Sequence, residues 1–495
     1  MGFPLFSAPI PMSRHPHPFR AEWAPSIPRE LMAGAVATFA LIPEVIAFSF
    51  VAGVDPAVGL FASFVISIVI AFAGGRPAMV SAAAGSVALV AAPLVHSHGV
   101  QYLFAAGVLA GLVQMLFGWL RLGTLMRYVS GSVRTGFVNA LAILIFSAQM
   151  PHLVGANLAT WAAVGAGLVI IYGLPRLTTV VPSPLVSIVV LTLAAQWLNL
   201  PLKTVADLGL LPDGLPSFGV PQVPLTWQTL QLIALPALAI AMVGLLESLM
   251  TASVVDELTD TPSAKNREAT GLGLANVAAS FFGGIAGCGM IGQTVSNVRY
   301  GGRGRLSTLF AGAFLLVLMV LLKPWVSKVP VAALVAVMVM VSASTFDWGS
   351  ARALWRHPKL SSVVMLATVV VTVLTDNLAA GVAVGVLLSG VFFTFKVARL
   401  IAVQPAEEGG ALVYRVSGQV FFASADMLVE AFDIRDIEGR PVRIDLTGTH
   451  FWDITAVNAL DKVCQRLRKH GSAVEVVGMN AQTRALVSRL DLAIE

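Results

Sequence analysis

Between two long apolar runs lies the stretch Gly283-Gly284-Ile285-Ala286-Gly287-Cys288-Gly289-Met290-Ile291-Gly292-Gln293-Thr294-Val295-Ser296-Asn297. Its many glycines are poor material for a continuous helix. The polar residues at its C-terminal end would lie at the depth of the hydrocarbon core of a membrane. Irregular backbone is tolerated at that depth only where it is buried in protein or lines a water-filled cavity. The stretch therefore predicts an extended segment that stops in mid-membrane, followed by a half-helix that starts near Gly292.

The start of such a half-helix would suit an anion, because its amide groups carry partial positive charge and unpaired donors. A glycine-rich contact between packed helices explains the same residues equally well. A second segment, Met79-Val80-Ser81-Ala82-Ala83-Ala84-Gly85-Ser86-Val87-Ala88, favours the first interpretation, because it is also a small-residue interruption between apolar runs. Gly85 and Gln293 are 208 positions apart, and the acids Glu44 and Glu247 are 203 positions apart. These similar offsets indicate an internal duplication with a binding site at the two interruptions.

The composition is that of a polytopic membrane protein. Hydrophobic residues make up 57% of the chain and charged residues only 12%, whereas a soluble domain carries about 25% charge. The net charge of +5 fits arginines that anchor cytoplasmic loops, and no basic patch interleaved with aromatic residues indicates nucleic-acid binding. The two cysteines, Cys288 and Cys464, have no metal-binding spacing, so we expect no metal site and no disulfide.

Apolar periodicity divides the chain into two halves with seven candidate spans each, although several fall short of the ~20 residues of a straight span. The expected parts are a Pro-rich cytoplasmic leader at 1–30, a first repeat at 31–197, an extracytoplasmic connection at 198–228, a second repeat at 229–398 and a tail domain at 402–495. The candidate spans are 31–51, 57–74, 78–95, 101–120, 132–150, 158–174, 178–197, 229–254, 267–283, 286–298, 306–323, 328–345, 359–375 and 377–395.

The loop charges predict the topology. With the leader inside, most loop arginines and lysines fall on the inner side, as the positive-inside rule requires. An odd number of spans per half places the start of the second half outside, so the two repeats are expected to be inverted, as in many secondary transporters.

Two acids stand inside predicted spans. Glu44 follows Pro43, which should kink or open the helix, and Glu247 lies deep in the eighth span. Glu44 at the outer interface and Glu247 paired with a polar group elsewhere are the structural alternatives. A carboxyl in hydrocarbon is a functional-site hypothesis by default. Since burial disfavours its charged form, it could take up a proton on one side and release it on the other. Proton coupling is the prediction, and Na⁺ held by the same acids would also serve.

The pattern of the tail predicts a small α/β domain on the cytoplasmic side. Alternating apolar residues mark strands at 411–416 and 442–446, helical periodicity follows at 455–463, and 473–478 is another strand. Strands that alternate with helices predict an α/β domain of about 90 residues.

Several motifs together resemble those of one family. They are Glu247-Ser248-Leu249, then Asn276 to Gly284 followed by Thr294, Asn297 and Gly301, then Gly59-Leu60-Phe61-Ala62-Ser63, then Asp376, and in the tail Asp445-Leu446-Thr447-Gly448 through Asp453-Ile454-Thr455-Ala456. Over about residues 30 to 490 the chain resembles the sulfate permease (SulP) family of anion transporters with a C-terminal STAS domain. The resemblance implies seven plus seven inverted transmembrane helices in core and gate domains, with half-helices in spans 3 and 10. It also implies a homodimer in the inner membrane.

Carried over to this sequence, the resemblance implies a substrate-binding site at Gly85, Ser86, Gly292, Gln293 and Thr294, with Glu44 and Glu247 as coupling residues. Animal relatives can carry a basic residue where Gln293 stands, so here helix ends and partial dipoles must select for charge. Soluble STAS proteins have a phosphorylatable Ser after the loop Asp, and here Ile454 follows Asp453. We therefore expect no phosphorylation at that position, while a cytoplasmic protein partner of the STAS domain stays open.

The sequence thus predicts a secondary active transporter of a small anion, such as sulfate, bicarbonate or a dicarboxylate, with a mild preference for a dicarboxylate. A passive anion channel of the same fold and a membrane sensor with STAS output are the alternatives. An enzyme is disfavoured, because no nucleophile–base pair or metal cluster is evident, and we expect no cofactor besides the coupling ion.

Overall fold

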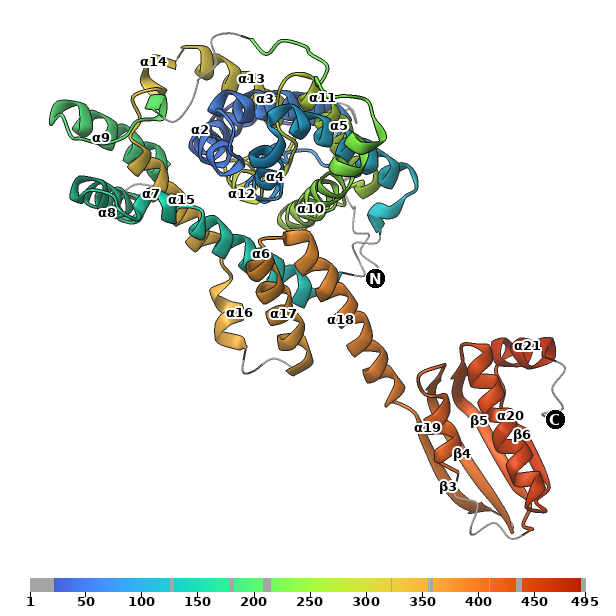
Figure 1. Cartoon of the computed structure of the whole chain (residues 1–495). Helices are drawn as coiled ribbons and strands as arrows, with labels where there is room; N and C mark the ends of the chain where they lie inside the picture. The colour runs from blue at the N-terminus through green and yellow to red at the C-terminus, as the bar shows by residue number, and fades with distance from the viewer. Residues whose placement is uncertain are drawn as a thin grey trace, which may run out of the picture. The chain divides into compact units, whose positions relative to one another are not determined.

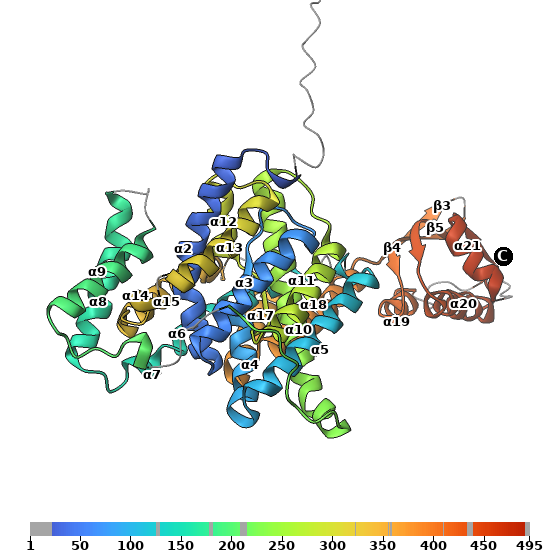
Figure 2. The same cartoon turned by 90° about the horizontal axis from the view of Figure 1, so that it is seen from above.

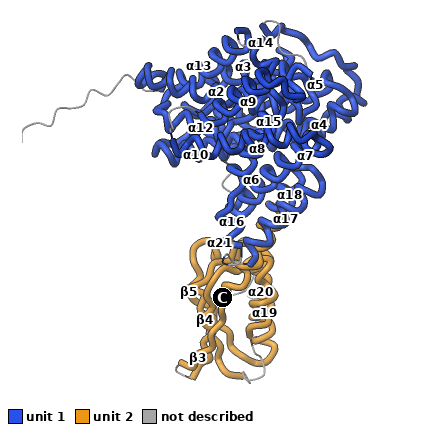
Figure 3. The backbone as a smooth tube through the Cα atoms, turned by 90° about the vertical axis from the view of Figure 1, so that its left-hand side faces the viewer, with its two compact units in different colours: residues 1–385 blue, residues 386–495 orange. Residues whose placement is uncertain are grey.

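The computed structural model describes residues 22–124, 129–177, 182–207, 215–321, 323–354, 356, 359–408, 410–432 and 439–490 (Figure 1). The chain divides into two compact units, residues 1–385 and residues 386–495 (Figure 3). Each of the five expected parts includes residues outside the described ranges, among them the leader up to residue 21, residues 178–181 at the start of the seventh candidate span, residues 208–214 of the connection and residues 491–495 of the tail domain.

The helices up to residue 398 follow the candidate spans closely, and the last of them crosses the boundary between the two units. The first half holds α2 (Ile27–Ala52), α3 (Pro56–Ala73), β1 (Ser81–Ala83), α4 (Gly85–His98), α5 (Val100–Trp119), α6 (Gly131–Ser147), α7 (Met150–Leu153), α8 (Leu158–Gly173) and α9 (Ser183–Trp197). The second half holds α10 (Trp227–Thr259), α11 (Lys265–Phe281), β2 (Gly287–Gly289), α12 (Ile291–Arg299), α13 (Arg305–Leu321), α14 (Lys323–Val326), α15 (Val331–Thr345), α16 (Trp348–Ala353), α17 (Lys359–Thr375) and α18 (Leu378–Ala398). Each predicted span corresponds to one long helix or to a short strand followed by a helix.

Local sequence explains where these helices begin and end. The side chain of Asn157 caps α8 by accepting a 2.8 Å hydrogen bond from the backbone N–H of Thr160. Gly53 ends α2 in the left-handed conformation, with φ of 73°. Seven of the described helices are long and apolar enough to cross a membrane, and four more apolar helices are shorter. The chain is a multi-pass membrane protein.

Equivalent helices of the two halves make equivalent contacts. α2 packs against α12 and α13, and its counterpart α10 packs against α4 and α5. Likewise, α5 packs against α11 as α13 packs against α3. The first four spans of each half form one group, and α6, α8, α9, α15 and α17 form a second group. Figures 1 and 2 show α8 and α9 away from α5 and α11. This arrangement corresponds to the expected core and gate domains.

Buried charges tie the core group together at one end. Glu30 accepts hydrogen bonds from the backbone N–H groups of Arg303, Gly304 and Ser307, at 2.8, 2.9 and 3.1 Å. Two arginines that the topology treats as loop anchors are in fact buried. Arg76 pairs with Asp256 at 3.1 Å, and Arg305 pairs with Glu22 at 2.6 Å. Each guanidinium thus has an acidic partner, and both arginines also donate to backbone carbonyls of neighbouring segments, which holds those segments in place.

The second unit contains a four-stranded sheet in the order β3-β4-β5-β6, flanked by helices. Its elements are β3 (Ala402–Glu408), β4 (Ala411–Val420), α19 (Ala425–Glu430), β5 (Val442–Phe451), α20 (Ile454–Lys469), β6 (Val474–Val477) and α21 (Ala481–Arg489). β3 is antiparallel to β4, and β4, β5 and β6 run parallel. Strand residues such as Ile444 and helix residues such as Leu460 share a core of their own. The predicted α/β architecture of the tail is confirmed.

Candidate functional site

Both interrupted segments consist of a short strand followed by a helix. β1 runs into α4 at Gly85, and β2 runs into α12 at Ile291, one residue before the predicted start. The two strands pair with each other in antiparallel register, with Ala82 opposite Cys288. The sequence predicted extended backbone here but not this pairing. It brings the starts of the two half-helices, one from each half of the chain, close together within the core group.

Buried polar side chains satisfy the backbone of these strands. The Asn276 side chain accepts a hydrogen bond from Gly287 N–H at 2.8 Å and donates one to Gly287 O at 3.1 Å. Ser63 and Ser248 accept from the backbone N–H groups of Ala83 and Gly289, at 3.2 and 2.8 Å. Unpaired backbone groups would be costly at this depth. These side chains therefore allow non-helical backbone inside a membrane protein.

Glu247 of α10 lies against both interrupted segments. The hydroxyl of Ser86, the second residue of α4, donates a hydrogen bond to Glu247 Oε2. The thiol of Cys288 in β2 donates to the same oxygen at 2.9 Å, and Ser86 Oγ and Cys288 Sγ are 3.8 Å apart. The carboxyl is buried, with 7% of the residue exposed. Cys288 was not among the predicted site residues, although it lies in the stretch that suggested the site.

Glu44 occupies the corresponding place in the first half. It is half-buried on α2 and lies within hydrogen-bonding reach of the Gln293 side chain in α12. Glu44 therefore reaches the half-helix of the second repeat, and Glu247 reaches the half-helix of the first. Of the two effects expected of Pro43, a kink or an opening, the opening is wrong, because α2 continues through Pro43 from Ile27 to Ala52. The loss of one backbone donor is tolerated within a helix packed on several sides.

The two half-helix starts differ in what covers them. The ring of Phe48 lies so close to Gly85 that a β-carbon there would stand 2.6 Å from Phe48 Cε1. Around Gly292, by contrast, a β-carbon would meet nothing within 4 Å, and the residue is exposed. The start of α12 is thus the more accessible of the two in this structure.

Thr294 connects α12 with the first interrupted segment. Its hydroxyl oxygen accepts a 3.0 Å hydrogen bond from Val80 N–H and lies 3.3 Å from Val80 O. The structure thus brings the predicted residues into two groups, Gly85 and Ser86 with Glu247, and Gly292 and Gln293 with Glu44. Thr294 faces the strand before α4. Within the described residues no group of three or more His, Cys, Asp or Glu could hold a metal ion.

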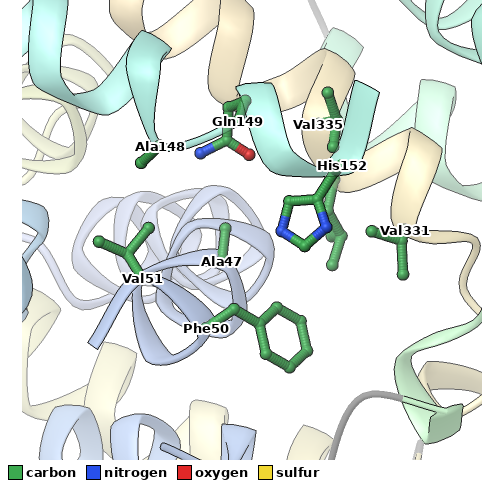
Figure 4. A pocket seen from close by; sticks show the side chains of 9 residues that line it. Ala47, Phe50, Val51, Ala148, Gln149, His152, Val331 and Val335 are labelled. Atoms are coloured by element: carbon green, nitrogen blue, oxygen red, sulfur yellow. The ribbon is translucent and has the colours of Figure 1, made fainter. Parts of the chain in front are cut away.

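A small cavity lies outside both groups, between α2, α7 and α15 (Figure 4). Its volume is about 40 Å³, and its polar lining residues are Gln149 and His152. The side chain of Gln149, in the turn between α6 and α7, donates a 3.2 Å hydrogen bond to Ile145 O of α6.

Comparison with known proteins identifies the family. The profile of the sulfate permease family matches residues 27–164 and 156–368, and that of the STAS domain matches residues 402–494. The chain belongs to the sulfate permease family. This family consists of transporters rather than enzymes, and membership confirms the resemblance drawn from the motifs.

Relatives of this sulfate permease family member match it over nearly the whole chain. YbaR of Bacillus subtilis (strain 168), a protein named for sulfate transport, is 50% identical over 471 residues, which are 95% of this chain and 98% of YbaR. The bicarbonate transporter BicA of Synechocystis is 25% identical over 487 residues, which are 88% of this chain and 85% of BicA.

Solved structures confirm the fold class. The transmembrane domain of a cyanobacterial bicarbonate transporter BicA superposes with a TM-score of 0.65, at 27% identity, over 72% of this chain and 97% of that domain. Murine Slc26a9, in the inward-facing state, superposes with a TM-score of 0.81 over 94% of this chain and 89% of that one, at 18% identity. The membrane unit therefore has the fold of this transporter domain, and the STAS profile accounts for the tail.

Proposed function

We propose that this protein is a secondary active transporter that carries a small anion together with a proton. Its family and its relatives named for sulfate and bicarbonate transport support the anion. The observation that carries the proposal is the crossed placement of the two acids. Glu44 and Glu247 each interact with the half-helix of the opposite repeat. Uptake or loss of a proton at either acid would therefore act directly on a segment that starts at the proposed anion site.

The anion would bind between the starts of α4 and α12. Gly85, Ser86, Gly292 and Gln293 would face it with amide groups and short polar side chains, while Thr294 would hold α12 in position through Val80. The side chains placed against the two acids, Ser86, Cys288 and Gln293, are uncharged. Backbone dipoles would then supply the attraction, as helix starts do elsewhere. The exposed start of α12 leaves room for the ligand.

Proton coupling is favoured over sodium coupling by the surroundings of Glu247. Its Oε2 already accepts hydrogen bonds from a hydroxyl and a thiol. A hard cation prefers several oxygen ligands, and sulfur is a soft ligand. A proton also compensates the anion, since moving one negative charge against an inside-negative potential costs about 2.3 kcal/mol per 100 mV.

Membrane placement and assembly follow the family pattern in this proposal. The chain would lie in the inner membrane as a homodimer, with its STAS domain in the cytoplasm, where it could bind a protein partner. The substrate would be sulfate, bicarbonate or a dicarboxylate. A site without a basic residue favours the dicarboxylate, whose two charges lie further apart. A thermal-shift screen of the purified protein against these anions measures the preference directly.

Uptake into proteoliposomes tests the function. For one proton per singly charged anion, a gradient of one pH unit supplies about 1.4 kcal/mol and should concentrate the anion about tenfold. Replacement of Na⁺ by choline should leave uptake unchanged. Glu247→Gln and Glu44→Gln should each abolish the pH-driven accumulation, whereas Glu257→Gln, on the exposed side of α10, serves as a matched control.

Three outcomes would contradict the proposal. A channel would only dissipate an imposed anion gradient, and a sensor would move no anion. If Glu44→Gln and Glu247→Gln both accumulate the anion as strongly as the unmodified protein when a pH gradient is imposed, the acids do not couple transport to protons.

A further inference from the structure

The small cavity between α2, α7 and α15 has room for water and two polar side chains to bind it. It is lined by Ala47, Phe50, Val51, Ala148, Gln149, His152, Val331, Leu334 and Val335. A water needs about 10–15 Å³ and polar partners. The cavity of about 40 Å³ therefore has room for water next to Gln149 and His152. Figure 4 shows the His152 ring between α7 and the side chains of α2.

His152 also lines two larger hollows next to this cavity. One has a volume of about 370 Å³ and is lined by residues of the loops around α7 and α9, including Asn157 and Lys203. The other has a volume of about 620 Å³ and lies where α2 and α4 end and α3 and α5 begin, with Asp55 in its lining. All three spaces have His152 in their lining, so this residue borders both the small cavity and the wider hollows. By the predicted topology these hollows face the extracytoplasmic side.

The small cavity lies next to the face of α2 that carries Glu44. Ala47 and Val51 line the cavity, and they follow Glu44 by three and seven residues. Residues at these spacings share one face of a helix. Ala47, in the cavity lining, is thus about one helical turn from Glu44, whose side chain reaches Gln293 at the start of α12. The cavity therefore brings His152 and Gln149 next to the part of α2 that follows Glu44.

We propose that His152 transfers protons between the outer solution and Glu44. This inference rests on the proposed function and assigns the outer part of its proton path. The neutral imidazole would accept a proton on one ring nitrogen from a hydronium ion in an outer hollow, which leaves water there, and would give up the proton of the other nitrogen to cavity water. That water would protonate the Glu44 carboxylate, and the imidazole would be left neutral as the other tautomer. Histidine suits this task because it exchanges protons near neutral pH.

The charges that face His152 come from two segments. Lys203, after α9, interacts with it electrostatically and lines one of the two outer hollows, and Asp55, before α3, lines the other. On α2 and α15 the cavity is lined by Ala47, Phe50, Val51, Val331, Leu334 and Val335, all of them apolar. A positive and a negative group thus flank the outer side of the ring, and the inner side meets only apolar groups and Gln149.

Two flux measurements in proteoliposomes test the inference. The first is accumulation of the anion driven by an inward proton gradient, and the second is exchange of labelled for unlabelled anion at equal pH. His152→Gln keeps a polar side chain but cannot carry a proton. It should slow the pH-driven uptake at least tenfold and leave the exchange within twofold, because exchange needs no net proton movement. His96→Gln and His98→Gln are matched controls, since both histidines are exposed at the end of α4.

The outcomes are distinct from those of the general proposal. If the unmodified protein shows no pH-driven uptake, the proposed function fails whatever His152 does. If it shows such uptake and His152→Gln retains it, the relay role is wrong. A second variant, His152→Asn, guards against a folding defect, and both variants must be monodisperse by size-exclusion chromatography. If both lose uptake and exchange equally, His152 belongs to the anion path, and the relay role is also wrong.

Discussion

The contact between Cys288 and Glu247 makes a prediction at the scale of one residue. The thiol donates a 2.9 Å hydrogen bond to Oε2, and both residues are buried. A hydrogen bond to a charged group contributes about 1.5–3 kcal/mol. Cys288→Ala removes this donor, so the charged carboxylate loses stabilisation relative to its protonated form. The pH profile of anion uptake should therefore move to higher pH, by roughly one pH unit if the lost hydrogen bond is worth about 1.4 kcal/mol.

Cys288→Ser separates this role from packing, because a hydroxyl can also donate and should restore most of the original profile. Cys464→Ala, in the STAS domain, provides the control. Burial raises the pKa of the Cys464 thiol to about 11, so that substitution changes no charge near neutral pH. A profile that is identical in Cys288→Ala and the unmodified protein would show that the thiol does not stabilise the carboxylate.

The sequence could predict single residues where chemistry alone makes them unusual. Carboxyls such as Glu44 and Glu247 stand out within apolar runs. The contacts of Cys288 and Phe48 did not stand out, because a cysteine or a phenylalanine is ordinary in a membrane helix. Their roles depend on which segment of the other half lies beside them, and this is a tertiary contact that no local pattern contains.

At the scale of elements, the pairing of β1 and β2 depends on a glycine. A β-carbon on Gly287 would lie 2.0 Å from Ala82 O of the paired strand. Gly287→Ala should therefore push the strands apart and destabilise the membrane unit by about 1–3 kcal/mol, the usual range for overpacking. Thermal unfolding in detergent, followed by the fraction that stays monodisperse, measures this loss.

Gly292→Ala is the matched substitution in the same stretch. Its added methyl group meets open space, so the unfolding temperature should stay unchanged. If the methyl group fills part of the proposed anion site, affinity for the anion should fall while stability is retained. Equal unfolding temperatures for Gly287→Ala and Gly292→Ala would show that the strand pairing tolerates a side chain.

Element positions were largely predictable, because apolar runs and polar interruptions report directly on burial in lipid. The predicted spans and the observed helices agree, and the half-helix of the second repeat begins within one residue of Gly292. The partner of each short strand could not be predicted. Ala82 and Cys288 are more than 200 positions apart, and three-residue strands carry no register signal of their own. Continuity of α2 through Pro43 likewise depends on its neighbours.

At the scale of the molecule, duplication explains why two acids and two half-helices occur. Each half is built alike, and the halves interlock so that α2 contacts α12 and α10 contacts α4. The similar offsets along the chain predicted the duplication, but the contacts between the halves were seen only in the structure. The loop charges predicted which side of the membrane each loop faces, but they could not show that Arg76 and Arg305 are buried. An arginine in a loop looks the same in the sequence whether it contacts lipid headgroups or pairs with an acid of the protein.

The STAS domain should be dispensable for anion binding but not for assembly. Its hydrophobic core is separate from that of the membrane unit, and both acids with their hydrogen-bonding partners lie within residues 1–385. Deletion of residues 402–495 should therefore leave the KM for the anion within about twofold and reduce the amount of dimer in the membrane. Uptake per reconstituted molecule measures the KM, and cross-linking in membranes measures the amount of dimer. Ile444→Asp in the full-length chain is the control for loss of tail residues, because it disrupts only the STAS core. A stable truncated protein with a much higher KM would mean that the tail shapes the binding site, since no buried contact of the acids themselves would have been removed.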